Sequence, residues 1–181
     1  MKIDARGQTA RRLNAAIAAS HDKVVEVEGV VGQRYLGTAL VDKILKIDGI
    51  PGNALGAYLD GAEIELFGNA QEATGDTMNA GQIVIHGSAG DATGYAMRGG
   101  KIFLDGDVGY RCGIHMKAYR DAHPATVIGG RAGSFLGAYQ AGATIVLLGA
   151  EDESRPACSF SATLHHPPDT SIRPSHHPPP P

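Results

Sequence analysis

Glycine recurs in this sequence with a period of 19 residues, and few folds accept such a period. Two interlocking series carry it, and a glycine of the second series is followed by one of the first after 7 residues. The first series is Gly37, Gly56, Gly75, Gly94, Gly113 and Gly137, and the second is Gly49, Gly68, Gly87, Gly106, Gly130 and Gly149, with one insertion of 5 residues before Gly130. A unit of this length is too short for a helix pair or a propeller blade, but it suits one rung of a solenoid. We therefore predict an all-β fold, a single-stranded right-handed parallel β-helix of about six rungs.

Side chains at fixed offsets from these glycines repeat the same chemistry, as a stacked coil requires. Four residues before each glycine of the second series stand Leu45, Ile64, Ile83, Ile102, Thr126 and Ile145, and two residues before stand Ile47, Leu66, Ile85, Leu104, Ile128 and Leu147. Three residues after each glycine of the first series stand Leu40, Leu59, Met78, Met97, Met116 and Gln140. We expect these three ladders to point inward and to form the core.

The stretch "GSAGDATG", residues 87–94, has the glycine content of a phosphate-binding loop. Such a loop is built once per domain and opens onto a helix, whereas this stretch has equivalents in "GNAQEATG", "GDVGYRCG" and "GRAGSFLG". Glycine permits the positive φ and the close approach between rungs that a tight bend requires. The repetition therefore indicates a structural corner.

Two regions lie outside the repeat, which occupies residues 23–149. In residues 1–22, Thr9 can cap a short helix that would cover the open first end of the coil. The apolar positions of this helix share one face: Ala10, Leu13, Ala16 and Ile17. Residues 150–181 are first acidic and then rich in histidine and proline, which is typical of a disordered tail.

Charge and composition exclude several classes of protein. The net charge is -3 and the basic residues are scattered, so we expect binding neither to nucleic acid nor to a membrane surface. Two cysteines, Cys112 and Cys158, form no disulfide framework, and no apolar stretch approaches the roughly 20 residues of a membrane span. The first residues lack the apolar core of a signal peptide. These features predict a cytoplasmic protein with reduced thiols.

The stretch "GYRCGIHMKAYRDAHP" gathers the most reactive side chains of the repeat: Arg111, Cys112, His115, Lys117 and His123. Cys112 falls in a column with Leu36, Leu55, Thr74, Thr93 and Leu136, which predicts a buried and unreactive thiol. His86, His115 and His123 occupy different columns, so we expect no shared metal ion. The sequence contains no nucleophile elbow, zinc-binding helix motif or Walker lysine. We predict no catalytic, cofactor-binding or metal-binding residue in this chain.

A docking surface is the remaining candidate for function. Three residues before each glycine of the second series, the outward column becomes apolar along the coil: Lys46, Glu65, Val84, Phe103, Val127 and Val146. The insertion at residues 117–124 must project from a regular coil, and it offers Lys117, Tyr119 and Arg120, with His115 close by in sequence. We predict that Val84, Phe103, Val127 and Val146 and this loop bind a partner, and that without a partner the chain forms a homo-oligomer. The alternative is that residues 150–181 fold back over the apolar column.

The chain resembles the GXGXG β-helix domain, which forms the C-terminal part of the glutamate synthase large subunit and also occurs as a separate subunit. The resemblance rests on "IDARGQTARRLNAAI", "GQRYLGTAL", "GNAQEATGDTMNAGQIVIHG", "GYAMRGGKIFLDGDVGYRCGIHMKAY" and "IGGRAGSFLGAYQAGATIVLLG". It covers residues 2–149. After Gly149 the family usually adds a further glycine-rich rung, and this sequence departs from that pattern.

The resemblance implies a non-catalytic structural subunit that holds a glutamine amidotransferase and an FMN-dependent synthase in register for ammonia channelling. FMN and iron-sulfur clusters would then belong to the partner subunits, and no catalytic residue transfers to this chain. A looser resemblance, through a "GIHMK"-like corner, links it to the β-helical subunit of formylmethanofuran dehydrogenase and of the formyltransferase/hydrolase complex. The insertion "KAYRDAHP" favours the glutamate synthase branch. A stand-alone enzyme on the same coil is the third alternative.

Overall fold

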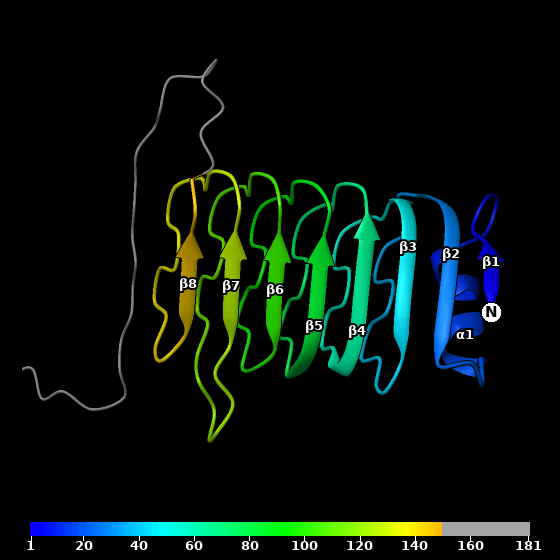
Figure 1. The fold of residues 1–181 in the computed structure, drawn as a ribbon, viewed down its shortest axis with the longest axis horizontal. Helices are drawn as coiled ribbons and strands as arrows, with labels where there is room; N and C mark the ends of the chain where they lie inside the picture. Colours follow the sequence, from blue (N-terminus) through cyan, green and yellow to red (C-terminus); the bar gives the residue numbers. More distant parts are fainter. Residues whose placement is uncertain (150–181) are drawn as a thin grey trace, which may run out of the picture.

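The computed structural model of the 181-residue chain describes residues 1–149 and shows one elongated coil (Figure 1). Its elements are β1 (Lys2–Asp4), α1 (Ala10–Ala19), β2 (Val24–Val31), β3 (Ile44–Ile50), β4 (Asp60–Phe67), β5 (Ala80–Ile85), β6 (Lys101–Leu104), β7 (Ala125–Ile128) and β8 (Thr144–Leu147). The eight strands form one sheet in chain order, and each strand is parallel to the next. The parallel β-helix predicted from the glycine period is therefore confirmed. The expectations for residues 150–181, a disordered tail or a cover over the apolar column, lie outside the described residues.

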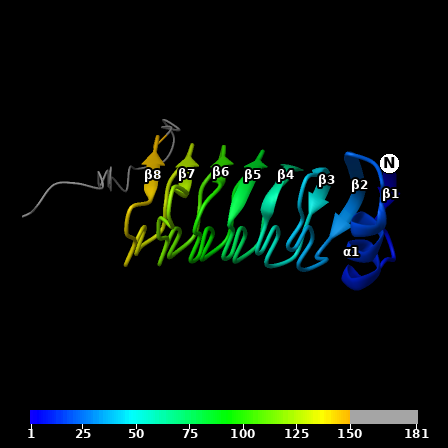
Figure 2. The same ribbon diagram turned by 90° about the horizontal axis from the view of Figure 1, so that it is seen from below.

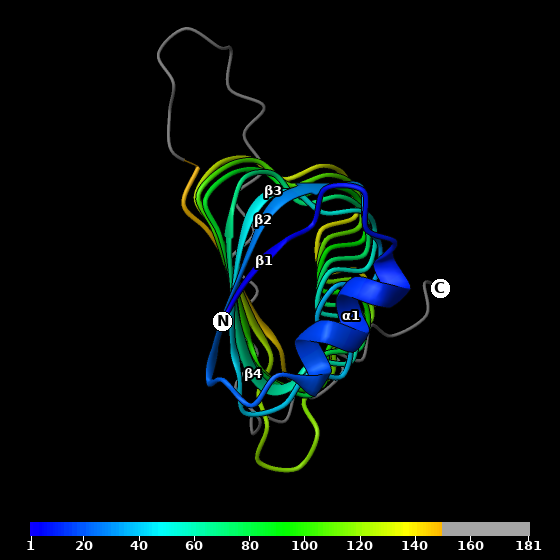
Figure 3. The ribbon, with the colours of Figure 1, turned by 90° about the vertical axis from the view of Figure 1, so that its right-hand side faces the viewer.

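The cross-section of the coil is a flattened loop with two different sides. Strands stack along one side, and the tight corners stack along the opposite side (Figures 2 and 3). Seen from the first rung, the chain runs clockwise as it recedes from the viewer, so the coil is right-handed (Figure 3). This is the hand that twisted strands favour in parallel connections.

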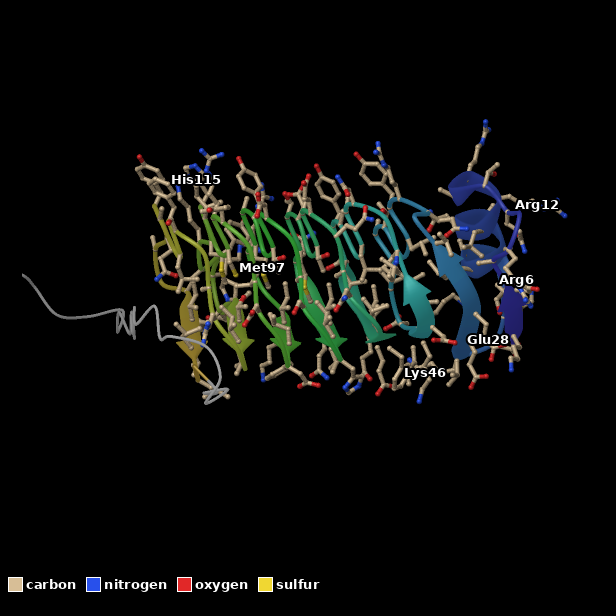
Figure 4. The ribbon with its side chains drawn as sticks, turned by 90° about the horizontal axis from the view of Figure 1, so that it is seen from above. Arg6, Arg12, Glu28, Lys46, Met97 and His115 are labelled. Atoms are coloured by element: carbon tan, nitrogen blue, oxygen red, sulfur yellow. The ribbon has the colours of Figure 1, made fainter. Side chains whose placement is uncertain are left out.

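The inward ladders are the core, as the sequence predicts. Strand pairing sets Leu45 against Ile64, Ile64 against Ile83, and so on through Ile102 and Thr126 to Ile145. All six side chains of this ladder are buried. The ladder that contains Met78, Met97 and Met116 lies inside the corners, and Figure 4 shows Met97 there. The last residues of two ladders, Leu147 and Gln140, are only half-buried. The side-chain oxygen of Gln140 is nevertheless buried and has no hydrogen-bond partner.

The first end of the coil differs from the prediction in one respect. The expected helix is present: the Thr9 hydroxyl accepts a hydrogen bond from the backbone N–H of Arg12, and Leu13 and Ile17 are buried against the first rungs. Before it lies β1, which pairs with β2 and adds a strand where the sequence predicts a purely helical cap. This strand has only three residues, of which one, Ile3, is buried, so it is too short to show an alternation of apolar and polar residues. The sequence pattern therefore could not reveal it.

The two glycine series serve different physical purposes. In the first series every glycine has a φ between 62° and 70°, so the left-handed conformation itself favours glycine there. In the second series, a Cβ at Gly68 would overlap the carbonyl oxygen of Gly49 on the preceding rung. From Gly49 to Gly130, close contact with the preceding rung therefore demands glycine near the end of each strand, whereas a Cβ at Gly149 would have no atom within 4 Å.

Each corner also holds two residues other than glycine in the left-handed region, with φ between 51° and 64°. They are Tyr35 and Ala39, Ala54 and Tyr58, Ala73 and Thr77, Ala92 and Ala96, Arg111 and His115, and Phe135 and Tyr139. Hydrogen bonds to both neighbouring rungs hold this unusual backbone: the N–H of Tyr58 donates to Asp76 on the next rung at 2.8 Å, and that of Gly56 donates to Leu36 on the previous rung at 2.8 Å. The corners are thus rigid platforms for their side chains.

Candidate interaction surfaces

The reactive neighbourhood around Cys112 is part of the core. The Cys112 side chain is completely buried, and this burial raises the pKa of its thiol to about 12. At neutral pH the group is therefore an uncharged thiol, which is a poor nucleophile and a poor metal ligand. The position predicted from its column is confirmed.

The histidines of the coil lie apart. Within residues 1–149, no group of three or more His, Cys, Asp or Glu side chains is arranged to hold a metal ion. His86 lies on the outer face of the sheet, His115 lies on a corner, and His123 lies in the projecting loop. The separation predicted from the columns is what the structure shows.

An ionic ladder crosses the outer face of the sheet from β3 to the end of β6. The Lys46 ammonium lies 3.2 Å from the Glu65 carboxylate, and the two ring nitrogens of His86 lie 3.3 Å from Glu65 and 3.2 Å from Asp105. The His86 ring also stacks on Phe67 with 5.0 Å between the ring centres. Hydrogen bonding to Glu65 and then to Asp105 raises the pKa of His86, and the same contact with His86 lowers the pKa of Glu65.

This ladder predicts a small pH dependence of stability. A histidine with a raised pKa in the folded state stabilises the fold fully below its unfolded pKa, near 6.5, and this contribution is lost as the pH rises through the folded pKa. The side chain is 39% exposed, so solvent screens the pairs and the gain is about 0.5 kcal/mol. We expect His86→Gln to lower the thermal midpoint more at pH 5.5 than at pH 9, where only the stacking on Phe67 is lost. His21→Gln, at an exposed site before the first full rung, is the control that should have no effect at either pH.

The apolar column forms a continuous strip over the second half of the sheet. Strand pairing sets Val84 against Phe103, Phe103 against Val127, and Val127 against Val146. Each of these side chains is half-buried, because its neighbours on adjacent rungs cover part of it. We call these four residues the apolar strip. This column of the outer face thus changes from charged at β3 and β4 to apolar from β5 to β8.

The insertion projects from the coil below β7 (Figure 1). Tyr119 and Ala122 exchange two backbone hydrogen bonds of 3.0 Å, which close the loop into a tight hairpin. At its tip the Arg120 guanidinium lies 5.1 Å from the centre of the Tyr119 ring, and both side chains are exposed. The loop therefore presents an aromatic ring and a cation to solvent, at the end of the sheet where β7 begins.

His115 belongs to a different face. It lies on the corner side, opposite the sheet surface that carries Lys46 (Figure 4). Its ring stacks on Tyr139 with 5.1 Å between centres and meets Tyr95 edge-on at 5.8 Å. The structure therefore brings the loop near the apolar strip but separates His115 from both.

Exposed rings line this corner side, a feature that the column patterns do not predict, and we call them the aromatic ridge. Its members are Tyr35, Tyr58, Tyr95, Tyr110, Phe135 and Tyr139, each of them exposed. The rings fall in several columns of the repeat, so no single column is aromatic throughout. A search for aromatic residues within two positions of any glycine of the first series would have revealed most of them.

The fold and these surfaces define the class of protein, which is a parallel β-solenoid. Its described residues form an apolar core, and its charged and aromatic side chains lie on the outer faces. The sequence matches the GXGXG motif family over residues 6–162, and the chain belongs to that family. It is 49% identical over 161 residues to the uncharacterized protein MJ1350 of Methanocaldococcus jannaschii. The alignment covers 83% of this chain and 60% of that relative. No solved structure matches the chain.

The one helix that the structure describes, α1, has ten residues, and neither its length nor its composition would let it cross a bilayer.

Proposed function

We propose that this chain is a structural subunit of a glutamate synthase-type complex and holds a glutamine amidotransferase and an FMN-dependent synthase component in register. FMN and iron-sulfur clusters would reside in those partners. Membership of the GXGXG motif family and the resemblance of residues 2–149 to the glutamate synthase β-helix domain support the proposal. The relative MJ1350 carries no function in its name, so the role of this chain rests on its own surfaces.

One observation carries the proposal: the hairpin at residues 117–124 projects from an otherwise regular coil and leads directly into β7, which carries Val127 of the apolar strip. A stacked coil is rigid, because each rung is bonded to both neighbours, and so it can fix the distance between two partners. Apolar area beside exposed aromatic and guanidinium groups is the composition that protein interfaces favour. Without partners, the same strip would pair two copies of the chain.

The hairpin provides the test. We expect Tyr119→Ala combined with Arg120→Ala to weaken binding to the synthase or amidotransferase component by about 2–3 kcal/mol, which is roughly a hundredfold in Kd. The thermal midpoint of the free chain should stay nearly unchanged, because both side chains are exposed and outside the ladders. Titration calorimetry with the purified components measures the first effect, and a melting curve measures the second.

A matched control is available on the opposite side of the coil. Arg34 and Tyr35 are an equivalent exposed pair on the corner side, so Arg34→Ala with Tyr35→Ala should leave binding intact. Normal binding by the hairpin variant would contradict the proposed interface. Co-purification with formyltransferase components, instead of glutamate synthase components, would favour the formyl-transfer alternative. Glutamine-dependent turnover by the isolated chain that Cys112→Ala or His115→Ala abolished would indicate an enzyme.

A further inference from the structure

The aromatic ridge contains a groove that neither the core nor the proposed interface uses. It has a volume of about 320 Å³ and lies on the corner side of the later rungs. Its lining is Ala92, Tyr95, Arg111, Ile114, Phe135, Ala138 and Tyr139. Two alanines and an isoleucine lie among exposed rings in this lining.

Side-chain contacts and the backbone conformation hold the rings that line the groove in place. The stacking of His115 on Tyr139, and its edge contact with Tyr95, link the rings of three successive rungs. The Arg111 guanidinium lies 6.0 Å from the centre of the Phe135 ring. Backbone φ values of 59° to 64° at Arg111, Phe135 and Tyr139 fix the direction in which these side chains leave the corner. The groove is thus preformed, and it combines flat apolar rings with one cation.

Aromatic grooves of this kind suit polyproline II segments, which pack their rings between aromatic side chains and lose little entropy on binding. Residues 167–181 of the chain itself have the high proline content of such ligands. Their prolines are Pro167, Pro168, Pro174, Pro178, Pro179, Pro180 and Pro181. Directly after the first pair stands Asp169, a carboxylate that can pair with Arg111.

Charge on the later rungs favours the approach of the chain that leads to this segment. The exposed side chains Arg98 and Lys117 lie on the rungs that carry the groove, and Arg111 lies within it, while the exposed Asp91 lies beside the groove residue Ala92. Residues 150–166 contribute Glu151, Asp152 and Glu153 against Arg155, and the segment itself holds Asp169 and Arg173. The cations of the later rungs therefore attract the acidic residues that precede the segment, and within the segment they can pair with Asp169.

Chain length permits the contact. Tyr139 precedes Gly149 by ten residues, so the groove lies within about 35 Å of the point where the described chain ends. Residues 150–166 number 17 and can span up to about 56 Å. The connection is therefore longer than the distance it must cover.

We propose that the proline-rich segment, residues 167–181, binds in the aromatic groove of its own chain. Pro167 and Pro168 pack between the rings of Tyr95, Phe135 and Tyr139, and Asp169 pairs with Arg111. This inference stands independently of the proposed complex, because the groove lies on the corner side and the proposed interface on the sheet side.

Site-specific spin labelling in the full-length chain tests the contact. Ser171→Cys with Cys158→Ser leaves one reactive thiol, because Cys112 is completely buried. A nitroxide on residue 171 should broaden the NMR amide signals of Ile114 and Ala138 until most of their intensity is lost. The signals of Leu36 and Leu55, on early rungs, should keep theirs.

Matched variants identify the groove as the cause. Phe135→Asn with Tyr139→Asn should abolish the broadening, whereas Tyr35→Asn with Tyr58→Asn, in the same two columns on earlier rungs, should leave it intact. Asparagine tolerates the positive φ at all four positions, and all four side chains are exposed, so these variants keep the fold. Asp169→Asn should reduce the broadening severalfold, since it removes the charge that faces Arg111.

Two outcomes would overturn the inference. One is broadening that the groove variant leaves unchanged, or no broadening of Ile114 and Ala138 at all. The second outcome comes from a mixing experiment, in which an isotope-labelled chain without nitroxide is mixed with an unlabelled chain that carries the nitroxide. Strong broadening in this mixture would show that the segment binds a second copy of the chain and not its own groove.

Discussion

Ile85→Asp should unfold the coil at room temperature. Ile85 is completely buried and lies between Leu66 and Leu104 on the adjacent rungs, so the new carboxylate would have only apolar neighbours in its ladder. An unpaired charge in such a place costs several kcal/mol, in addition to the lost burial of the isoleucine. The total, about 5 kcal/mol or more, is comparable to the whole stability of a domain. Circular dichroism in increasing urea measures the loss.

The control for this substitution lies on the same strand. Gln82→Asp places the same charge on the outer face of β5, opposite Lys101, and it should change stability by less than about 0.5 kcal/mol. A folded Ile85→Asp chain with a normal urea midpoint would show that the ladder is not the core that holds the rungs together.

Gly68→Ala should strongly destabilise the repeat, although it adds only one methyl group. The new Cβ would overlap the carbonyl oxygen of Gly49, and the glycine φ of 153° is also unfavourable for other residues. The overlapping atom belongs to the backbone of a hydrogen-bonded rung, so relief requires the two rungs to separate. We expect a loss of about 3 kcal/mol in the free energy of unfolding, measured by urea titration.

Two other glycines separate steric overlap from backbone strain. Gly32 has a φ of 75°, and a Cβ at this position would have no atom within 4 Å, so Gly32→Ala should cost only about 1 kcal/mol. Gly56 has a φ of 63°, and its Cβ would meet the end of the Ile83 side chain at 2.7 Å, which can shift. Gly56→Ala should therefore fall between the other two. Equal losses at all three positions would contradict the distinction between steric overlap and backbone strain.

The candidate surfaces were only partly predictable, for a definite reason. The apolar strip could be read from one column, since Val84, Phe103, Val127 and Val146 repeat at a constant offset from the glycines. The groove could not, because Tyr95, Phe135 and Tyr139 belong to different columns and meet only through the packing of adjacent corners. His115 lies next to the loop in sequence, but the chain turns at the corner between them, so His115 lies on the face opposite the sheet surface that carries Lys46.

The architecture of residues 23–149 could be predicted from the residue pattern alone. A coil repeats its backbone path in every rung, so the same position must meet the same environment, and this requirement appears directly as the glycine period and the ladder from Leu45 to Ile145. The pairing of β1 with β2, the ionic contacts of His86 and the rings around the groove became visible only in the folded chain. The strand β1 lies before the repeat and is too short to show a period, and the other two features depend on side chains that face away from the core, where the repeat imposes no residue type.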